Sequence, residues 1–254
     1  MPPSSATGPV ILALETATTC GSLALVAEDR CLAEYSLSTP ATHSRSLLTG
    51  IHWLLAQCDL SWPQIAAIAV SLGPGSFTGL RIALSTAKGL CMAAEKPLIG
   101  VETLTGLASQ FPFSSLPICP VIDARKSEIY TALYRCNPQG IPEKTIEAMV
   151  IKPERLQEFI TTPTLLVGDG LPLYGQMLKE LLGDLALLAP TEICFARAAS
   201  IGSVAWHLFR QGAFLDPATA VPIYVRASDA ELQFGEKKGI KKGNAEDAGK
   251  TVTV

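Results

Sequence analysis

The stretch SLGPGSFTGLRIALSTAKGL at residues 71–90 decides how this chain is expected to fold. The apolar run 65–70 precedes it and predicts a buried strand, and residues 80–88 contain no Gly or Pro, which predicts a helix. The unit is therefore a strand, a glycine-rich loop and a helix. Glycines in the loop permit positive φ angles and leave backbone N–H groups beside the helix N-terminus, where a phosphate can bind.

The spacing of the loop glycines fits none of the better-known phosphate or nucleophile motifs. It reads G-x-G-x-x-x-G, one residue longer than the dinucleotide fingerprint, and no Lys follows the last glycine as a P-loop requires. Gly75 directly precedes Ser76, so G-x-S-x-G does not fit either. Two interpretations stay open: a ligand loop, or a tight turn whose glycines are steric and whose Ser76 or Thr78 caps the helix.

Two helices of the first half have apolar side chains suited to packing. The helix after the loop is apolar on two sides, which predicts one cover from its own sheet and another from a second helix or a different protein. Residues 42–58 predict an amphipathic helix.

Composition narrows the class of protein. The 254 residues are 48% hydrophobic and 17% charged, with a net charge of −3, and no apolar run approaches the ~20 residues that span a bilayer. We expect a globular cytoplasmic protein, because the start lacks a secretory pattern and the seven cysteines are scattered without C-x-x-C spacing. Outside its Lys-rich tail the chain has no basic surface of the kind that binds nucleic acid alone.

The order of elements predicts a duplicated α/β fold. The turn ETATTC at 15–20 and the turn DARKSE at 123–128 each separate two predicted strands. Asp123, Arg125 and Glu128 are interpreted most simply as pairing with one another or capping the turn, and their role stays open. The predicted division is an N-terminal domain at 1–110, a second domain at 111–212, a segment returning to the first domain at 213–234, and a disordered tail at 235–254.

Catalytic constellations are not expected. The three histidines form no H-E-x-x-H pair, and no Ser-His-Asp, Cys-His or zinc set can be assembled. We therefore predict neither a catalytic metal site nor a protease.

Several segments resemble the bacterial TsaB (YeaZ) family, over roughly residues 10–232. The resemblance implies two RNase H-like domains of the actin-like and sugar-kinase superfamily. The segments that carry it, in order, are ILALETATTCGSLAL, ATHSRSLL, SLGPGSFTGLRIALSTAKGL, VIDARKSEIY, GDG and PIYVRASDAEL.

The resemblance also implies a function. It implies a non-catalytic subunit that activates TsaD, the enzyme that transfers threonylcarbamoyl to adenosine 37 of tRNAs reading ANN codons, with TsaE as a further partner. The region matching the TsaD metal histidines, KGLCMAAEKPLIGVETLTGLA, contains no histidine here. The chain is expected to form a homodimer when it is alone and to meet tRNA only through the complex. No cofactor is expected, although binding of ATP or ADP and Mg²⁺ at the complex interface stays open.

The family contact is expected through the helices of the first half, so a charge at Ala83 or Ala87 should abolish pairing and leave the monomer folded. The predicted interface residues are His43, Leu47, Leu48, Ile51, Leu54, Gly79, Leu80, Ala83, Leu84, Ala87, Lys88 and Cys91.

The alternative function is a nucleotide-binding ATPase or kinase-like enzyme of the same superfamily, since ETATTC resembles its first phosphate turn. The residues predicted for a nucleotide or phosphate are Glu15, Thr16, Gly73, Gly75, Ser76 and Thr78.

Overall fold

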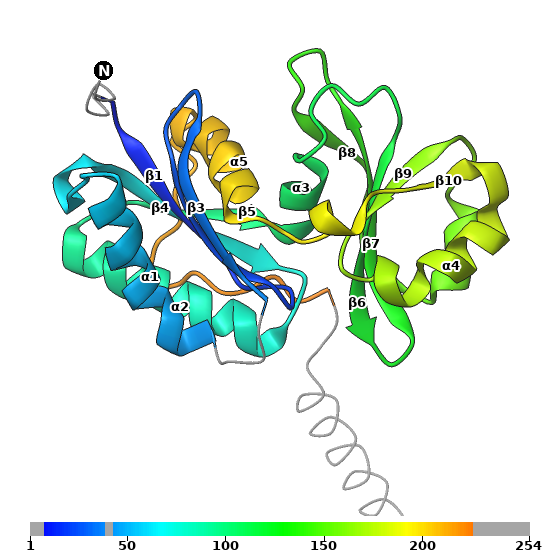
Figure 1. Ribbon diagram of the computed structural model, residues 1–254, viewed down its shortest axis with the longest axis horizontal. Coiled ribbons are helices and arrows are strands. Elements are labelled where there is room, and N and C mark those ends of the chain that lie inside the picture. The colour runs from blue at the N-terminus through cyan, green and yellow to red at the C-terminus, as the bar shows by residue number, and fades with distance from the viewer. Residues whose placement is uncertain (1–7, 39–42, 226–254) are drawn as a thin grey trace, which may run out of the picture. The chain divides into compact units, whose positions relative to one another are not determined.

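The structure is a computed structural model that describes residues 8–38 and 43–225, with side chains described from residue 47 in the second range. The predicted tail at 235–254 lies outside these residues. Within the described part of the chain, the strands form two sheets of five strands each (Figure 1).

The first sheet has the strand order β3-β2-β1-β4-β5. β2 is antiparallel to both of its neighbours, whereas β1, β4 and β5 run parallel. The two central strands, β1 and β4, are apolar runs because parallel strands in the middle of such a sheet are covered on both faces. The strand bounds are β1 Val10–Glu15, β2 Gly21–Val26, β3 Cys31–Leu37, β4 Ile65–Gly73 and β5 Leu98–Glu102.

Helices cover both faces of the first sheet, as alternation along β1 requires. Leu12 and Leu14 pack in one buried cluster with α1 (His43–Gln57) and α2 (Phe77–Ala94). Ile11 and Ala13 point the other way and pack with α5 (Ala198–Arg210). Figure 1 shows α1 and α2 on one side of this sheet and α5 on the other.

The second sheet repeats this arrangement in the order β10-β9-β6-β7-β8. β7 is antiparallel to β6 and β8, and β6, β9 and β10 run parallel. Both sheets thus have the 3-2-1-4-5 order of an RNase H-like domain, and the predicted duplicated actin-like fold is confirmed. The strand bounds are β6 Ile118–Arg125, β7 Glu128–Cys136, β8 Pro142–Ile151, β9 Thr164–Val167 and β10 Ala186–Leu188.

The remaining helices connect these strands. The α-helices are α3 Thr103–Ala108 and α4 Leu171–Leu182, and the 3₁₀ helices are Trp62–Gln64, Pro153–Glu158, Gly183–Leu185 and Thr191–Ile193.

The chain returns to the first sheet earlier than predicted. α5 falls within the predicted second domain at 111–212, yet Trp206 Nε1 donates to Val26 O at 2.9 Å and Ala198 N donates to Ser22 Oγ at 2.9 Å. α5 packs on the first sheet because its apolar face is buried there. The division into domains at 1–110 and 111–212 stays a proposal.

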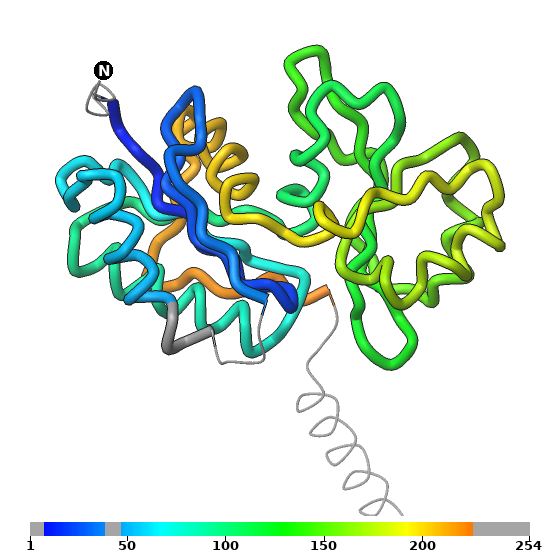
Figure 2. Tube along the Cα trace, viewed as in Figure 1, coloured from blue at the N-terminus to red at the C-terminus, as the bar shows by residue number. Residues whose placement is uncertain are grey.

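The predicted return of segment 213–234 can be followed as far as Ile223. Leu215 N donates to Leu98 O at 2.8 Å, and Ile223 N donates to Leu72 O at 2.7 Å. Figure 2 shows this orange segment running along the first sheet. All described residues up to Ile223 belong to one compact unit.

The packing of α5 is open to a direct test through Ile201, which is fully buried. We expect Ile201→Ala to lower the free energy of unfolding by about 2–5 kcal/mol, because it leaves a cavity between α5, α3 and the first sheet. Ser203→Ala, on the exposed side of the same helix, should change it by less than about 0.5 kcal/mol. Urea unfolding measures both, and equal values would contradict the packing of α5.

Candidate functional site

The glycine-rich loop between β4 and α2 lies directly against the turn after β1. Thr16 Oγ1 donates to Gly79 O at 2.7 Å, and Ser76 N donates to Ala17 O at 2.7 Å. Ser76 is also the N-cap of α2, since its Oγ accepts from Gly79 N at 3.2 Å. The N–H groups of Ser76 and Gly79, which belong to the loop expected to bind a phosphate, therefore donate hydrogen bonds within the chain.

The loop glycines are explained by this close approach. A Cβ at Gly79 would lie 1.9 Å from Thr16 O, and a Cβ at Gly75 would lie 2.4 Å from Ala17 O. Gly73 has φ +115°, which L side chains rarely adopt. The geometry favours the steric interpretation of the motif over a ligand loop, and Thr78 lies exposed beside it.

Glu15, at the end of β1, has a fully buried carboxyl. Its Oε1 accepts from Ala17 N, and its Oε2 has no hydrogen-bond partner among the described residues. Burial raises the pKa of Glu15 from 4.5 to about 7, although the Ala17 amide favours the charged form. The hydroxyl of Ser71, also fully buried, lies near this carboxyl without a hydrogen bond of normal geometry.

Asp169 brings a second acid to the same place from the other half of the chain. Burial raises its pKa from 3.8 to about 6, and the backbone N–H groups of Thr19 and Asp123 favour its carboxylate. The charge of Asp169 in turn contributes to raising the pKa of Glu15. GDG at 168–170 was one of the segments that carry the family resemblance, but Asp169 was not among the predicted site residues. The sequence did contain a signal for this site, because GDG places an acid between two glycines directly after an apolar strand. In the second half this position corresponds to the glycine loop of the first half.

Asp123 and Arg125, whose role stayed open, pair with each other. Arg125 N donates to Asp123 Oδ1 at 2.9 Å, and the guanidinium lies 3.4 Å from Oδ2. Tyr174 Oη donates to the same carboxylate at 3.4 Å. This pairing matches the simpler interpretation of the DARKSE turn.

Neither a metal cluster nor a membrane helix is present in the part of the chain that the structure describes. No three His, Cys, Asp or Glu side chains at 8–38 and 47–225 are placed to hold a metal ion together. None of the helices in these ranges is long and apolar enough to cross a membrane.

Most residues predicted for the partner interface are buried inside the first half, which corrects the prediction for them. They line the inner faces of α1 and α2 and pack on the chain's own sheet, because the apolar rows that looked two-sided mostly face inward. The side chain of His43 lies outside the described residues, Leu48 is exposed, and Lys88 is partly exposed. The buried members are Leu47, Ile51, Leu54, Gly79, Leu80, Ala83, Leu84, Ala87 and Cys91.

The outer side of α1 and α2 nevertheless has large exposed apolar groups. Leu48 is 60% exposed, Trp53 51%, Phe77 39% and Met92 72%. The Arg81 guanidinium lies 3.8 Å from the centroid of the Phe77 ring. Neither helix contains Asp or Glu, whereas α2 contains Arg81 and Lys88. We call these exposed residues of α1 and α2 the helical face.

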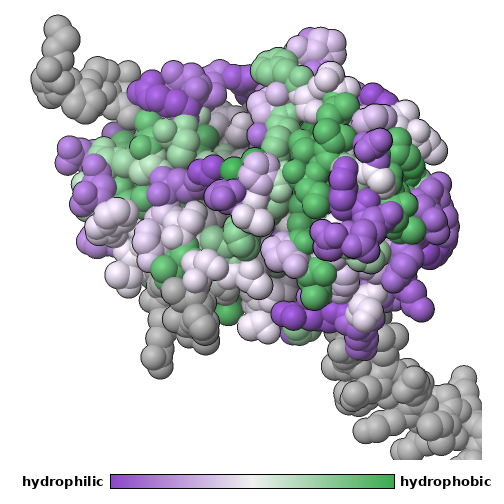
Figure 3. All heavy atoms as spheres, turned by 45° about the vertical axis from the view of Figure 1, so that its right-hand side comes forward, coloured by the Kyte–Doolittle hydropathy of each residue, from purple (hydrophilic) through white to green (hydrophobic). Residues whose placement is uncertain are grey.

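Other exposed apolar side chains lie on the second half. They are Phe113 before β6, Leu173 and Leu181 in α4, and Leu187 and Leu188 in β10. Figure 3, turned to bring this side forward, shows apolar and polar groups interspersed.

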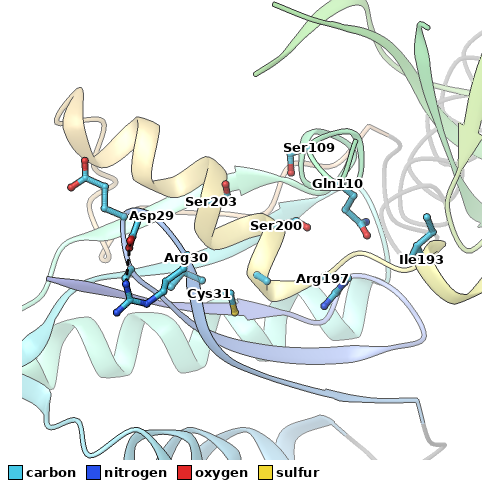
Figure 4. A pocket seen from close by; sticks show the side chains of 13 residues that line it. Asp29, Arg30, Cys31, Ser109, Gln110, Ile193, Arg197, Ser200 and Ser203 are labelled. Atoms are coloured by element: carbon cyan, nitrogen blue, oxygen red, sulfur yellow. Dashed lines mark hydrogen bonds and ion pairs between the residues drawn. The ribbon is translucent and has the colours of Figure 1, made fainter. Parts of the chain in front are cut away.

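A cavity of about 350 Å³ lies between the β2–β3 hairpin, the end of α3 and α5 (Figure 4). Its lining includes the hydroxyls of Ser109, Ser200 and Ser203. Its two arginines are already paired, Arg30 with Asp29 and Arg197 with Glu34. The acid Glu28 of the lining pairs with Arg210 outside it, so each charged group of the lining already has a partner and none singles out a ligand.

The steric role of Gly79 has a matched control on the same helix. Gly79→Ala should lower the free energy of unfolding by about 1–3 kcal/mol, because the new methyl group collides with Thr16 O. Nothing lies within 4 Å of a Cβ at Gly89, so Gly89→Ala should raise it by about 0.5–1 kcal/mol through helix propensity. Urea unfolding without nucleotide is the measurement, and an Ala tolerated at Gly79 would contradict the steric interpretation.

Comparison with known proteins gives consistent matches over most of the chain. The family model described as TsaD, tRNA N6-adenosine threonylcarbamoyltransferase, matches residues 35–233. The tRNA threonylcarbamoyladenosine biosynthesis protein TsaB of Escherichia coli K12 is 32% identical over 222 residues, covering 85% of this chain and 94% of its own length. TsaB of Bacillus subtilis 168 is 29% identical over 231 residues, covering 90% and 99%.

A solved structure gives the same result. YeaZ from Pseudomonas aeruginosa superposes with a TM-score of 0.73 at 28% identity, covering 85% of this chain and 99% of that one. Sequence, fold and relatives agree, and the chain belongs to the TsaB (YeaZ) family of tRNA threonylcarbamoyladenosine biosynthesis proteins.

Proposed function

We propose that this chain is a non-catalytic subunit that docks on TsaD through its helical face and activates threonylcarbamoyl transfer to adenosine 37 of tRNAs reading ANN codons. Membership of the TsaB family establishes a part in this modification. The observation that carries the docking proposal is the helical face itself. Four large apolar side chains, Leu48, Trp53, Phe77 and Met92, stand on two adjacent helices that contain no acid.

Such a face suits a protein partner better than water. Exposed apolar groups gain free energy when another surface covers them, and aromatic, Met and Arg side chains are enriched at interfaces. Gly89 is exposed with open space above it, so a partner helix can approach the backbone of α2 closely. Because its helices lack acids, the face fits a partner with acidic groups opposite Arg81 and Lys88.

The shared fold supports TsaD as that partner. The family model named for the transferase matches most of this chain, so the two subunits are expected to have the same layer of helices over the first sheet. Two such layers can pack against each other as helix on helix. The same face is proposed to form a homodimer when TsaD is absent, as the weaker of the two contacts.

The interior of the chain supports a bracing role for the glycine loop. The Ser76 and Gly79 N–H groups already donate hydrogen bonds within the chain, so neither is available to a phosphate. We therefore keep nucleotide hydrolysis only as the alternative outcome of the experiment below. Contact with tRNA is proposed to run through TsaD, since the net charge of this chain is −3. TsaE is proposed to act on the assembled pair.

The function is tested by threonylcarbamoyl transfer to unmodified tRNA by TsaD, with TsaE, ATP and threonylcarbamoyl-AMP, in the presence and absence of this chain. We expect modification to depend on adding the chain. Modification that is indifferent to it would refute the activating role, and ATP hydrolysis by the pure chain would favour the alternative.

Docking through the helical face is tested by placing charges at its exposed positions. Ala83 and Ala87 are not used, because a charge buried there would unfold the monomer. Leu48→Asp and Met92→Glu should each weaken TsaD binding by about tenfold or more, because an unpaired charge would be desolvated in the interface. Calorimetric titration measures the affinity, and circular dichroism checks the fold.

Leu173→Glu is the matched control, since Leu173 is 65% exposed but lies on α4 of the second half. It should bind TsaD like the wild-type chain. If all three variants bind equally, the helical face is not the docking site.

A further inference from the structure

The turn at 16–20 and the turn at 168–170 bring together two acids from the two halves of the chain, Glu15, which is fully buried, and Asp169, which is half-buried. Glu15 precedes the first turn, and Asp169 is the middle residue of the second. The Thr19 N–H favours the Asp169 carboxylate, so this acid from the second half meets the backbone of the first. Glu15 Oε2 and Asp169 Oδ1 are both buried without a hydrogen-bond partner among the described residues.

Both acids are held in place by tight backbone packing. A Cβ at Gly168 would lie 2.1 Å from Val121 O, and Gly170 N donates to Val121 O at 3.0 Å, which fixes the second turn on β6. The first turn is fixed on α2 by the contacts of Thr16 and Ala17. The Glu15 carboxyl is therefore shielded from water, whereas Asp169 is half-buried and only its Oδ1 is shielded.

We propose that loss of protons from Glu15 and Asp169 opens the contact between the turns at 16–20 and 168–170, which makes this contact a pH-sensitive clasp between the two halves of the chain. A protonated carboxyl tolerates burial, whereas a carboxylate needs water or donors. Opening of the clasp supplies that water and also relieves repulsion between the two charges.

The neighbouring titratable groups do not replace the missing donors. Arg125 is paired with Asp123, an acid whose charge itself disfavours the Asp169 carboxylate. Tyr174 donates to Asp123. The thiols of Cys20 and Cys194 lie close by, and burial raises the pKa of each, so both stay neutral near pH 7.

The direction in which stability changes with pH follows from the direction of both pKa shifts. Each acid binds its proton more tightly in the folded chain, with pKa values of about 7 for Glu15 and about 6 for Asp169. The folded state then holds more protons than the unfolded state as the pH rises from the unfolded to the folded pKa, so stability falls across this window and stays low above it. Since one pKa unit is tenfold in an equilibrium constant, the unfolding constant should rise about tenfold or more between pH 5 and pH 8.

Urea unfolding against pH tests this sign. Glu15→Gln should flatten the profile, because Gln retains an acceptor for Ala17 N but cannot ionise. Asp169→Asn should flatten it partly. Glu192→Gln, at an exposed carboxyl, should leave the wild-type slope unchanged. A wild-type profile that does not fall with rising pH would overturn the proposal.

Local opening is tested by thiol labelling with peptide-resolved mass spectrometry. Cys20 lies in the first turn and is 8% exposed, while Cys119 is 2% exposed in the core of the second sheet. At pH 8 Cys20 should label at least about threefold faster in the wild-type chain than in Glu15→Gln, and at pH 5 the rates should agree. Cys119 should label equally slowly in both proteins.

A change in the pKa of the Cys20 thiol cannot produce the faster labelling expected in the wild-type chain. The Glu15 charge raises the pKa of Cys20, so its removal alone would speed labelling in the variant. Equal Cys20 rates at pH 8, or a parallel rise at Cys119 that indicates global unfolding, would overturn the clasp. The experiment uses the chain alone, so its failure is separate from any failure to bind TsaD.

Discussion

The contact that the rest of the first half depends on is the approach of the α2 N-terminus to the turn after β1. Thr16 Oγ1 bonds to Gly79 O at 2.7 Å, and a Cβ at Gly79 would lie 1.9 Å from Thr16 O. The approach places the first turn of α2 on the end of β1, which orients the whole helix over the sheet. α2 then covers β4 with its inner side, and its outer side is exposed.

The same turn links three parts of the molecule. Glu15 and Thr19 lie close to Asp169 of the second half, Thr16 and Ala17 hold the glycine loop, and α2 of the helical face begins directly after that loop. The turn and the glycine loop are held together by contacts of the chain with itself. The buried acids are the exception, because their charged forms oppose the packing that surrounds them.

The two surfaces of α2 show why a site of this kind is hard to predict. Ala83 and Ala87 were expected to meet a partner, since an alanine row on a helix is typical of close helix packing. They are fully buried under the chain's own strands, whereas Met92 of α2 and Leu48 of the neighbouring α1 are exposed. Periodicity shows that a helix has an apolar side, but it does not show which apolar side the same chain covers.

The sequence by itself determined the duplicated strand pattern and the glycine loop before α2, because local periodicity and turn residues report on nearby neighbours. Its segments also resemble the TsaB family, and that resemblance pointed to the family. Only the tertiary structure decided that α5 crosses back to the first sheet, that the loop glycines are steric, and that Asp169 meets the turn beside Glu15. Each of these depends on contacts between residues more than fifty positions apart. Such contacts are set by how sheets and helices pack, and no short stretch of sequence encodes them.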